Sequence, residues 1–359
     1  MTLLLRQLYD GESGTYSYLL GDSESRECII IDPVYERVER DLALIDELEL
    51  KMRYSVETHC HADHVTAAWL LRQSTNCSIA AARTTEIQGL DVALADGDAL
   101  PFGPFELQVL ATPGHTSGCI SLYLPEPGTV FTGDALLIRG CGRTDFQQGS
   151  AATLYRSITD RLFTLPEDTL VYPAHDYDGR TVSTIGEEKR LNPRIGGGAN
   201  ERDFVGFLQN LQLPHPKKID VAVPANLNLG KPESSSMPQA QSWAPITTTY
   251  AGILEVRPQW VAANLDSVHV LDVRTRVETD EEPARIASAQ LIPLDELRER
   301  LSEVPTNLPV VTLCRSGRRS VMAFDILRKE GWNEVANVKG GLLAWYAEGL
   351  PLAAASEAE

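Results

Sequence analysis

The sequence predicts two α/β domains in one chain. Its 359 residues exceed the size of one ordinary domain, which is about 100–150 residues. Short β-rich runs alternate with helical runs in both halves, and a stretch rich in Pro, Ser and Gln separates the halves. These observations indicate an N-terminal domain at residues 1–228, a linker at 229–249 and a C-terminal domain at 250–359.

Both domains show the alternation of strands and helices in order along the chain. In the N-terminal domain, β-rich apolar runs predict strands at 27–32, 53–58, 129–137 and 168–176, and helical periodicity predicts helices at 38–50 and 65–74. In the C-terminal domain, the same criteria predict strands at 268–274 and 307–313 and helices at 294–304, 320–331 and 340–349. The acidic run VETDEEPAR at 277–285 is interpreted as a solvated loop.

Composition narrows the classes of partner. A formal net charge of −18 is unsuited to binding phosphates, so we expect no nucleic acid and no anionic membrane as partners. Apolar runs are too short for a membrane-spanning helix or a signal peptide, which makes the cytoplasm the default location. The six cysteines are scattered without CxxC pairs, and we expect reduced thiols. An anionic substrate would need local arginines in so acidic a protein.

Metal-ligand side chains cluster at predicted strand ends in the N-terminal domain. The motif THCHADH places four of them directly after a strand, at His59, His61, Asp63 and His64. Three further ones follow other strand-like runs next to Gly or Pro, at His115, Asp134 and His175. Imidazoles packed so tightly repel one another when protonated unless a cation organises them. The pattern therefore predicts a metal site assembled from several strand ends, whereas His215 and His269 lie in no motif and are interpreted as structural.

The motif HxHxDH with the later His115, Asp134 and His175 resembles the ligand set of the metallo-β-lactamase fold. The resemblance covers about residues 1–225 and implies an αββα sandwich with the metal at one edge of two packed sheets. The segments LLIRGCGRTDFQQGS, YPAHDYDGRTVSTIGEEKRLNPR and LPHPKKIDVAVPAN are similar to those of persulfide dioxygenases. Hydrolases such as glyoxalase II share the fold, so fold alone does not give the activity.

In the persulfide dioxygenase family two His and one Asp hold a single iron(II), and the resemblance carries these roles to His59, His115 and Asp134. It makes the other ligand-type residues groups that orient the site, namely His61, Asp63, His64 and His175. Every residue needed for a second metal is nevertheless present, so the residues by themselves leave a dinuclear centre open.

Four residues near the metal motifs are candidates for further roles. By resemblance to the glutathione-dependent relatives, Arg143 and Tyr177 are expected to contact glutathione. Arg139 is a solvated arginine or an anion contact. Cys141, between two glycines, is a thiol beside the metal or a small residue at a tight turn.

The C-terminal domain carries a thiol at the end of an apolar run, in PVVTLCRSGRRSVMAFDIL. A loop that curls over a helix N-terminus points backbone N–H groups at the thiol of Cys314 and stabilises its anion. The loop resembles the active-site loop of rhodaneses, with Arg315, Ser316, Gly317, Arg318 and Arg319. LDVRT with Asp272 and Arg274, and GGLLAWYAEGLPL, resemble the start and end of a rhodanese domain. A thiol phosphatase would need Arg six positions after the Cys, where this chain has Ser320.

Together the resemblances imply an enzyme with two linked activities. The first is iron-dependent oxidation of glutathione persulfide by dioxygen to sulfite and glutathione. The second is transfer of sulfane sulfur between thiosulfate and glutathione through a persulfide on Cys314. The alternatives are a glyoxalase-II-like dinuclear thioester hydrolase with a sulfurtransferase domain, and a sulfane-sulfur carrier or sensor. A homodimer is one assembly that the sequence allows.

Overall fold

The structure is a computed structural model that describes residues 2–211, 213–214, 216–234, 242–281 and 285–352. The described residues fall into two compact units, which lie within residues 1–238 and 239–359. The described ends of the expected linker belong to these units, because Leu229 packs in the first unit and Trp243 and Ala244 pack in the second. The central part, residues 235–241, lies outside the described residues.

The first unit contains two facing sheets. The first sheet has the order β1-β2-β3-β4-β5-β6, with strands at Leu3–Asp10, Thr15–Asp22, Glu27–Ile31, Lys51–Glu57, Ser78–Ala82 and Val92–Leu94. The second has the order β14-β13-β10-β9-β8-β7, with strands at Ser183–Thr184, Leu170–Pro173, Thr129–Gly133, Ile120–Leu124, Phe105–Ala111 and Ala99–Phe102. A short hairpin, β11 (Leu136–Leu137) and β12 (Gly140–Cys141), follows β10.

Apolar residues from both sheets meet in the core between them. Tyr18, Ile29 and Val56 of the first sheet lie in one buried cluster with Leu122 and Phe131 of the second. Strand β2 is buried along its whole length, so it lacks the alternation of a strand with one wet face. The two inner faces therefore exclude water and fix the sheets against each other.

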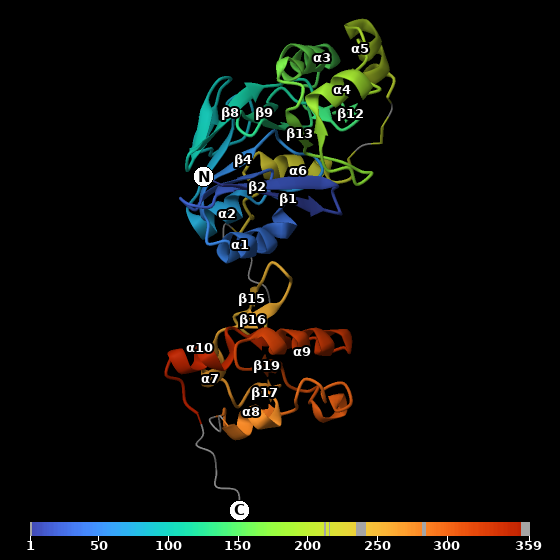
Figure 1. Ribbon diagram of the computed structural model, residues 1–359. Helices are drawn as coiled ribbons and strands as arrows, with labels where there is room; N and C mark the ends of the chain where they lie inside the picture. The colour runs from blue at the N-terminus through green and yellow to red at the C-terminus, as the bar shows by residue number, and fades with distance from the viewer. Residues whose placement is uncertain (1, 212, 215, 235–241, 282–284, 353–359) are drawn as a thin grey trace, which may run out of the picture. The chain divides into compact units, whose positions relative to one another are not determined.

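Helices cover the outer faces of both sheets (Figure 1). The first sheet carries α1 (Val38–Glu47) and α2 (Ala68–Thr75), and the second carries α3 (Ala151–Asp160), α4 (Ile185–Leu191) and α5 (Glu201–Gln209). Helix α6 (Ile219–Asn226) follows near the end of the unit. This arrangement is the expected αββα sandwich. No helix in the described residues is long and apolar enough to cross a membrane.

The second unit is built on one largely parallel sheet of order β15-β16-β20-β19-β17-β18. Its strands are Thr247–Thr248, Leu254–Val256, Val335–Val338, Val310–Leu313, His269–Asp272 and Gln290–Leu291. Helices α7 (Pro258–Ala263) and α10 (Gly341–Ala347) pack in one apolar cluster, and α9 (Arg318–Lys329) packs in another. Helix α8 (Arg276–Glu281) follows β17 (Figure 1).

Two expected elements of the second unit are wrong. Residues 294–304 form successive turns and the short 3-10 helix Leu301–Glu303 rather than an α-helix. Backbone bonds there span three residues, as from Leu297 N–H to the Leu294 carbonyl and from Arg300 N–H to the Leu297 carbonyl. The acidic run at 277–285 is not wholly a loop, because its first part belongs to α8.

Candidate metal centre and thiol loop

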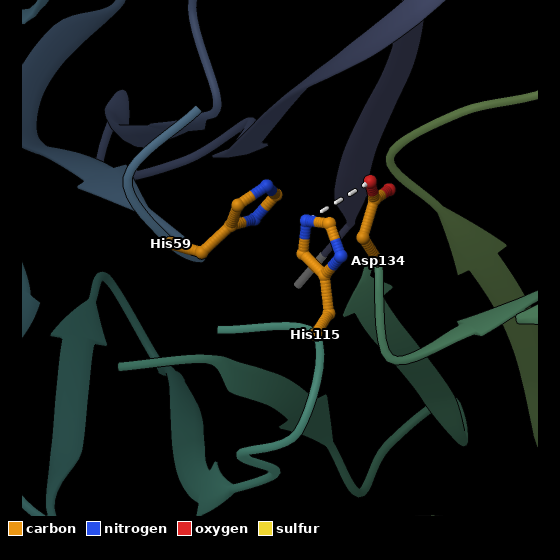
Figure 2. Close-up of side chains that lie close together, drawn as sticks. All are labelled: His59, His115 and Asp134. Carbon is orange, nitrogen blue, oxygen red and sulfur yellow. Dashed lines mark ion pairs between the residues drawn. The ribbon is translucent and has the colours of Figure 1, made fainter. Parts of the chain in front are cut away.

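The histidine-rich motif occupies the loop between β4 and α2. His59, His61 and His64 are each at most 2% exposed there. His115 lies in the loop between β8 and β9, and Asp134 directly follows β10. Figure 2 shows the side chains of His59, His115 and Asp134 converging from these three segments. The two sheets therefore deliver ligands from distant parts of the chain to one point.

These three side chains form a group that could hold a metal ion. One ligand atom from each of His59, His115 and Asp134 lies within 4.8 Å of the others. The Nδ1 atom of His115 donates to the carbonyl oxygen of Arg143 at 2.7 Å, so Nε2 is the ring nitrogen that remains to bind a metal. That Nε2 faces Asp134 Oδ2 at 3.6 Å.

The other two ligands are oriented in the same way. His59 Nδ1 contacts the Thr58 hydroxyl at 3.0 Å, and Asp134 Oδ1 accepts from His175 Nδ1 at 2.6 Å. Each ligand thus uses one atom to fix its orientation and presents another to the common centre, as bound metals require. The donor set fits a metal that accepts two imidazoles and one carboxylate.

Electrostatics favour the protonation states in which His59 and Asp134 can bind a metal. Burial, helped by the charges of His61 and His115, holds the pKa of His59 well below its usual range. Burial raises the pKa of Asp134, but the charge and hydrogen bond of His175 outweigh it and hold that pKa below its usual range. His59 is therefore neutral and Asp134 ionised at neutral pH.

The remaining ligand-type residues lie beside this centre in a second group. His61, Asp63 and His64 offer atoms within 4.8 Å of one another, and Asp63 Oδ2 contacts both His64 Nδ1 at 2.9 Å and His175 Nε2 at 3.0 Å. The Thr15 hydroxyl donates to Asp63 Oδ2 at 2.9 Å and lies 3.1 Å from His175 Nε2. Thr15 could not be identified from the sequence, because a threonine within a strand-like run does not indicate a binding site.

His61 faces carboxylates as well as histidines. Its Nε2 lies 3.1 Å from Asp32 Oδ1 and 3.5 Å from Glu57 Oε2, and all three side chains are buried. Burial lowers the pKa of His61, but these carboxylates outweigh it and raise that pKa well above its usual range. His61 is thus the residue of the histidine loop that contacts the buried carboxylates of Asp32 and Glu57.

Arg143 lies next to the centre, but its guanidinium is engaged. It forms a two-pronged ion pair with Asp145 at 2.7 Å and donates to the carbonyl oxygens of Leu213 and Pro214. Its charge also lies 4.3 Å from the centroid of the Phe146 ring. A substrate carboxylate would have to share or displace Asp145, and the glutathione contact of Arg143 stays a prediction.

Arg139 pairs with two carboxylates, whereas Arg143 pairs with one. It forms ion pairs with Glu187 at 2.9 Å and with Glu188, which is fully buried. Arg139 has a left-handed backbone (φ 57°), and its amide donates to Glu188 Oε2 at 2.9 Å. These contacts indicate that Arg139 fixes the β11–β12 turn onto α4, so its role as an anion contact stays a prediction with little geometric support.

Tyr177 and Cys141 occupy opposite environments. The Tyr177 ring is 75% exposed and stacks beside His175, with ring centroids 6.0 Å apart. Gly14 (φ 75°) lies under this ring, where a Cβ atom would come within 2.9 Å of it. Cys141 is buried in the apolar cluster beneath α3, and burial raises its pKa to about 11. Tyr177 is available to a ligand, whereas Cys141 is a neutral packed thiol.

In the second unit, Cys314 directly follows β19 and is buried. Residues 315–317 turn the chain into α9, and Gly317 adopts a left-handed conformation (φ 92°) that favours glycine. The Ser320 hydroxyl lies 3.4 Å from Cys314 Sγ. Burial raises the pKa of Cys314, but hydrogen bonds from this hydroxyl and from the Ser316, Arg319 and Ser320 amides outweigh it and lower that pKa.

The first residues of α10 support the thiol loop from beneath. The Leu342 amide donates to the Cys314 carbonyl at 3.0 Å, and the Leu343 amide donates to the Arg315 carbonyl at 2.9 Å. A Cβ atom at Gly341 would lie 2.4 Å from the Cys314 carbonyl oxygen, so only glycine permits this approach. Gly341 therefore allows the start of α10 to pack directly against the backbone of the thiol loop.

The arginines of the loop differ in their surroundings. Arg315 and Arg318 are exposed, whereas Arg319 forms a two-pronged ion pair with Glu278 of α8 at 2.5 and 2.6 Å. Glu278 also accepts from the Thr275 amide at the start of α8, which fixes it in place. The interpretation of the acidic run as only a solvated loop is thus wrong, because Glu278 contacts the thiol loop.

Asp272 lies beside the thiol loop without contacting the thiol. It pairs in the sheet with Leu313, one residue before Cys314, and its carboxylate holds the buried Arg274 at 2.8 Å. Asp272 therefore stabilises the strand next to the one from which the thiol loop begins.

Two histidines are interpreted from the sequence as structural. His269 Nε2 contacts Gln290 Oε1 at 2.8 Å, and His215 lies outside the described residues.

Comparisons with known proteins agree with the folds of both units. Residues 10–175 match the model of the metallo-beta-lactamase superfamily, and residues 257–348 match that of the rhodanese-like domain. The human protein named persulfide dioxygenase ETHE1, mitochondrial, is 53% identical over 229 residues, which is 64% of this chain and 89% of that protein. A crystal structure of ETHE1 from Myxococcus xanthus is 51% identical, with a TM-score of 0.61, and covers 63% of this chain and 99% of that one.

A more distant relative has a different named activity. The hydroxyacylglutathione hydrolase of Brucella anthropi is 40% identical over 172 residues, covering 46% of this chain and 62% of that protein. A structure of a metallo-beta-lactamase from Staphylococcus aureus is 22% identical with a TM-score of 0.60, and covers 94% of this chain and 98% of that one. At that identity the last likeness concerns the fold alone.

Proposed function

This chain belongs to the persulfide dioxygenase family of the metallo-β-lactamase superfamily and carries a C-terminal rhodanese-like domain, and from that premise we propose a bifunctional enzyme of sulfur metabolism. The N-terminal domain oxidises glutathione persulfide with dioxygen to sulfite and glutathione. The C-terminal domain moves sulfane sulfur between thiosulfate and glutathione. The observation that carries the proposal is the convergence of His59, His115 and Asp134, each with one oriented ligand atom.

The proposed cofactor is one iron(II) per chain, held by His59, His115 and Asp134. A ferrous ion in a site of two His and one carboxylate supplies redox chemistry and open positions for dioxygen and a substrate sulfur. The protein contributes orientation: the Arg143 carbonyl fixes the His115 ring, and His175 holds Asp134 through a hydrogen bond of 2.6 Å. Ligands held in this way lose little freedom on binding the ion.

The glutathione part of the substrate is proposed to lie over Tyr177. Its ring is exposed and stacks beside His175, which hydrogen-bonds Asp134 of the proposed centre. Arg143 then supplies a cation for a glutathione carboxylate in a chain whose net charge of −18 repels anions. Arg139 is the weaker candidate for the same role, because two carboxylates already hold it.

The sulfurtransferase step uses Cys314 as the nucleophile. Its thiolate attacks the outer sulfur of thiosulfate, the S–S bond breaks, and sulfite leaves with the bonding electron pair. The resulting Cys314 persulfide passes its terminal sulfur to the glutathione thiolate and regenerates the Cys314 thiolate. Hydrogen bonds from the Ser320 hydroxyl and the loop amides stabilise both sulfur anions.

The fusion joins the two reactions in sequence. Thiosulfate and glutathione give glutathione persulfide and sulfite, so the product of the C-terminal domain is the substrate of the N-terminal one. A tether raises the effective concentration of one site near the other. The cytoplasmic location and the homodimer stay predictions.

A glyoxalase-II-like thioester hydrolase is the second candidate for the N-terminal domain. It is favoured by the second group of ligand-type residues, His61, Asp63 and His64, with His175 Nε2 3.0 Å from Asp63 Oδ2, and by the likeness to a hydroxyacylglutathione hydrolase. The third candidate, a sulfane-sulfur carrier or sensor, predicts a single turnover with free glutathione. Each candidate gives a different metal content or turnover number.

One experiment tests the proposal against both alternatives. Oxygen uptake is measured on adding glutathione persulfide to protein whose metal content has been quantified. We expect repeated turnovers and about one iron per chain, on the argument that two His and one carboxylate bind a single ferrous ion. Two zinc ions per chain, with thioester hydrolysis and no oxygen uptake, would establish the hydrolase instead.

A further inference from the structure

The last residue of α6, Asn226, reaches into the backbone of the histidine loop. It is 2% exposed, and its side-chain amide makes three hydrogen bonds there. Its Nδ2 group donates to the His61 carbonyl at 2.9 Å and to the His64 carbonyl at 2.8 Å. Its Oδ1 atom accepts from the Thr66 amide at 2.8 Å. One side chain thus spans the stretch that carries most of the HxHxDH motif.

The chemistry of a carboxamide matches this loop. Residues 58–65 form neither a helix nor a strand, so their buried carbonyls and amides need other partners. Asn offers two N–H donors and an acceptor on one short planar group, which pairs with two carbonyls and one N–H. Asp presents oxygen to all three, and Ala presents nothing. The orientation of the amide is fixed, because reversing it would face its oxygen to two carbonyl oxygens.

The segment after Asn226 secures it against the same loop. The Trp69 amide donates to the Leu229 carbonyl at 3.1 Å. Gly230 (φ 67°) lies so close that a Cβ atom would come within 2.0 Å of the Thr66 carbonyl oxygen. Asn226 therefore belongs to a surface that is tightly packed on the loop, rather than to a mobile helix end.

We propose that Asn226 is a positioning residue for the metal site, which holds the backbone of His61, His64 and Thr66 and so fixes the direction in which the loop presents His59. The inference rests on the proposed metal ligands and not on the proposed reaction. Asn226 lies beyond residues 10–175, the segment that matches the superfamily model, so the residues shared across that model do not include it. Loss of the three Asn226 hydrogen bonds should lower metal affinity, because the loop must then become ordered when the ion binds. Changes to groups that orient ligands typically weaken metal binding by about 10–100-fold.

The test compares Asn226→Ala and Asn226→Asp with Asn228→Ala in the full chain. Asn228 is a matched control, since it is exposed two residues further on and its side-chain amide donates to the Pro224 carbonyl of its own segment, at 3.2 Å. Metal-free proteins are titrated with Co²⁺ against a competing chelator, and the dissociation constant and the visible spectrum are recorded. Asn226→Asp keeps the size of the side chain and serves if Asn226→Ala does not fold.

We expect both Asn226 variants to bind Co²⁺ at least about tenfold more weakly, with an altered spectrum, and Asn228→Ala to match the parent. Hydrogen exchange of the metal-free parent and Asn226→Asp should show faster exchange at Thr66 in the variant. Variants that melt earlier yet keep the affinity and spectrum of the parent would overturn the proposal, since Asn226 would then support only the fold. If the parent binds Co²⁺ but consumes no oxygen, the proposed reaction fails and the result for Asn226 stands.

Discussion

The two sites of this chain are built in opposite ways. The metal centre collects His59, His115 and Asp134 from the ends of segments in two sheets, and its orienting partners come from still other segments. The groups that contact the thiol lie almost wholly in residues 314–320, which are the loop after β19 and the first residues of α9. The first depends on the packing of a whole domain, whereas the second depends on local backbone geometry.

This difference has a physical consequence. A site assembled from distant segments is ordered only when the sheets are packed, and each ligand contributes separately to metal affinity. A thiolate in one loop is stabilised by amides that the turn itself orients. A side-chain change at the metal site should therefore remove one activity completely, while changes around the thiol should mostly be graded, apart from loss of the sulfur itself.

The largest expected effect separates the two sites. His115→Ala should lose the metal and all oxygen uptake with preformed glutathione persulfide, because one of three ligands is gone. It should still form persulfide from thiosulfate and glutathione. Cys314→Ser should give the reverse, with oxygen uptake lost for thiosulfate plus glutathione and nearly unchanged for preformed persulfide. Oxygen consumption by both variants under both substrate regimes measures the separation.

The controls for this comparison are metal content and folding. Cys314→Ser should retain the iron content of the parent, and His115→Ala should retain a folded second unit. If Cys314→Ser stays folded and loaded with iron yet no longer oxidises preformed persulfide, the two sites are not independent, and Cys314 takes part in the oxidation itself.

The same contrast explains what could be predicted from the sequence. The His and Asp residues stand out because several rare ligand types follow strand-like runs, and the Cys314 loop stands out because its residues are contiguous. Asn226 could not be found in this way, since it lies 160 residues from the Thr66 amide that it binds. Its value depends on a three-dimensional match between one amide and three backbone groups.

The partners of charged residues are a second feature that could not be predicted from the sequence. An acidic run is usually solvated, so nothing in the sequence distinguishes Glu278, which pairs with Arg319, from its neighbours. For the same reason the sequence could not show that Arg143 and Arg139 already have carboxylate partners. Ion pairs depend on which side chains meet, and spacing along the chain does not contain that information.

An effect of at least about tenfold is expected at Arg143. The Arg143→Ala variant should mainly raise the apparent KM for glutathione persulfide, because a hydrogen bond to a charged group contributes about 1.5–3 kcal/mol. Steady-state oxygen uptake measures this change. Asp145→Ala is the matched control, since it frees the guanidinium from its ion pair at 2.7 Å and should lower KM if substrate and Asp145 compete. An unchanged KM in both variants would assign Arg143 to holding residues 213–214 alone.

The smallest expected effect concerns the thiol and tests how local its stabilisation is. Ser320→Ala removes the hydroxyl that lies 3.4 Å from Cys314 Sγ but leaves the loop amides in place. Because that hydroxyl lowers the pKa of Cys314, its loss should raise the pKa. Because the contact of 3.4 Å is long, its hydrogen bond to the thiolate should contribute only about 1 kcal/mol, so alkylation by iodoacetamide at neutral pH should slow about fivefold. Well above the raised pKa the thiol is fully ionised in both proteins, and the two rates should converge.

Selectivity and a matched variant make this measurement interpretable. Burial raises the pKa of the other thiols, to about 12 for Cys28, Cys60 and Cys119, so Cys314 should be the thiol that reacts at neutral pH. Ser316 stabilises the thiolate through its backbone amide and has an exposed side chain, so Ser316→Ala should leave the pH profile unchanged. If Ser320→Ala also leaves the profile unchanged, the backbone amides of the loop lower the thiol pKa without help from the Ser320 side chain. If it shifts the profile to lower pH, the Ser320 hydroxyl does not donate to the thiolate, and its hydrogen bond to Asn337 at 2.7 Å is the dominant one.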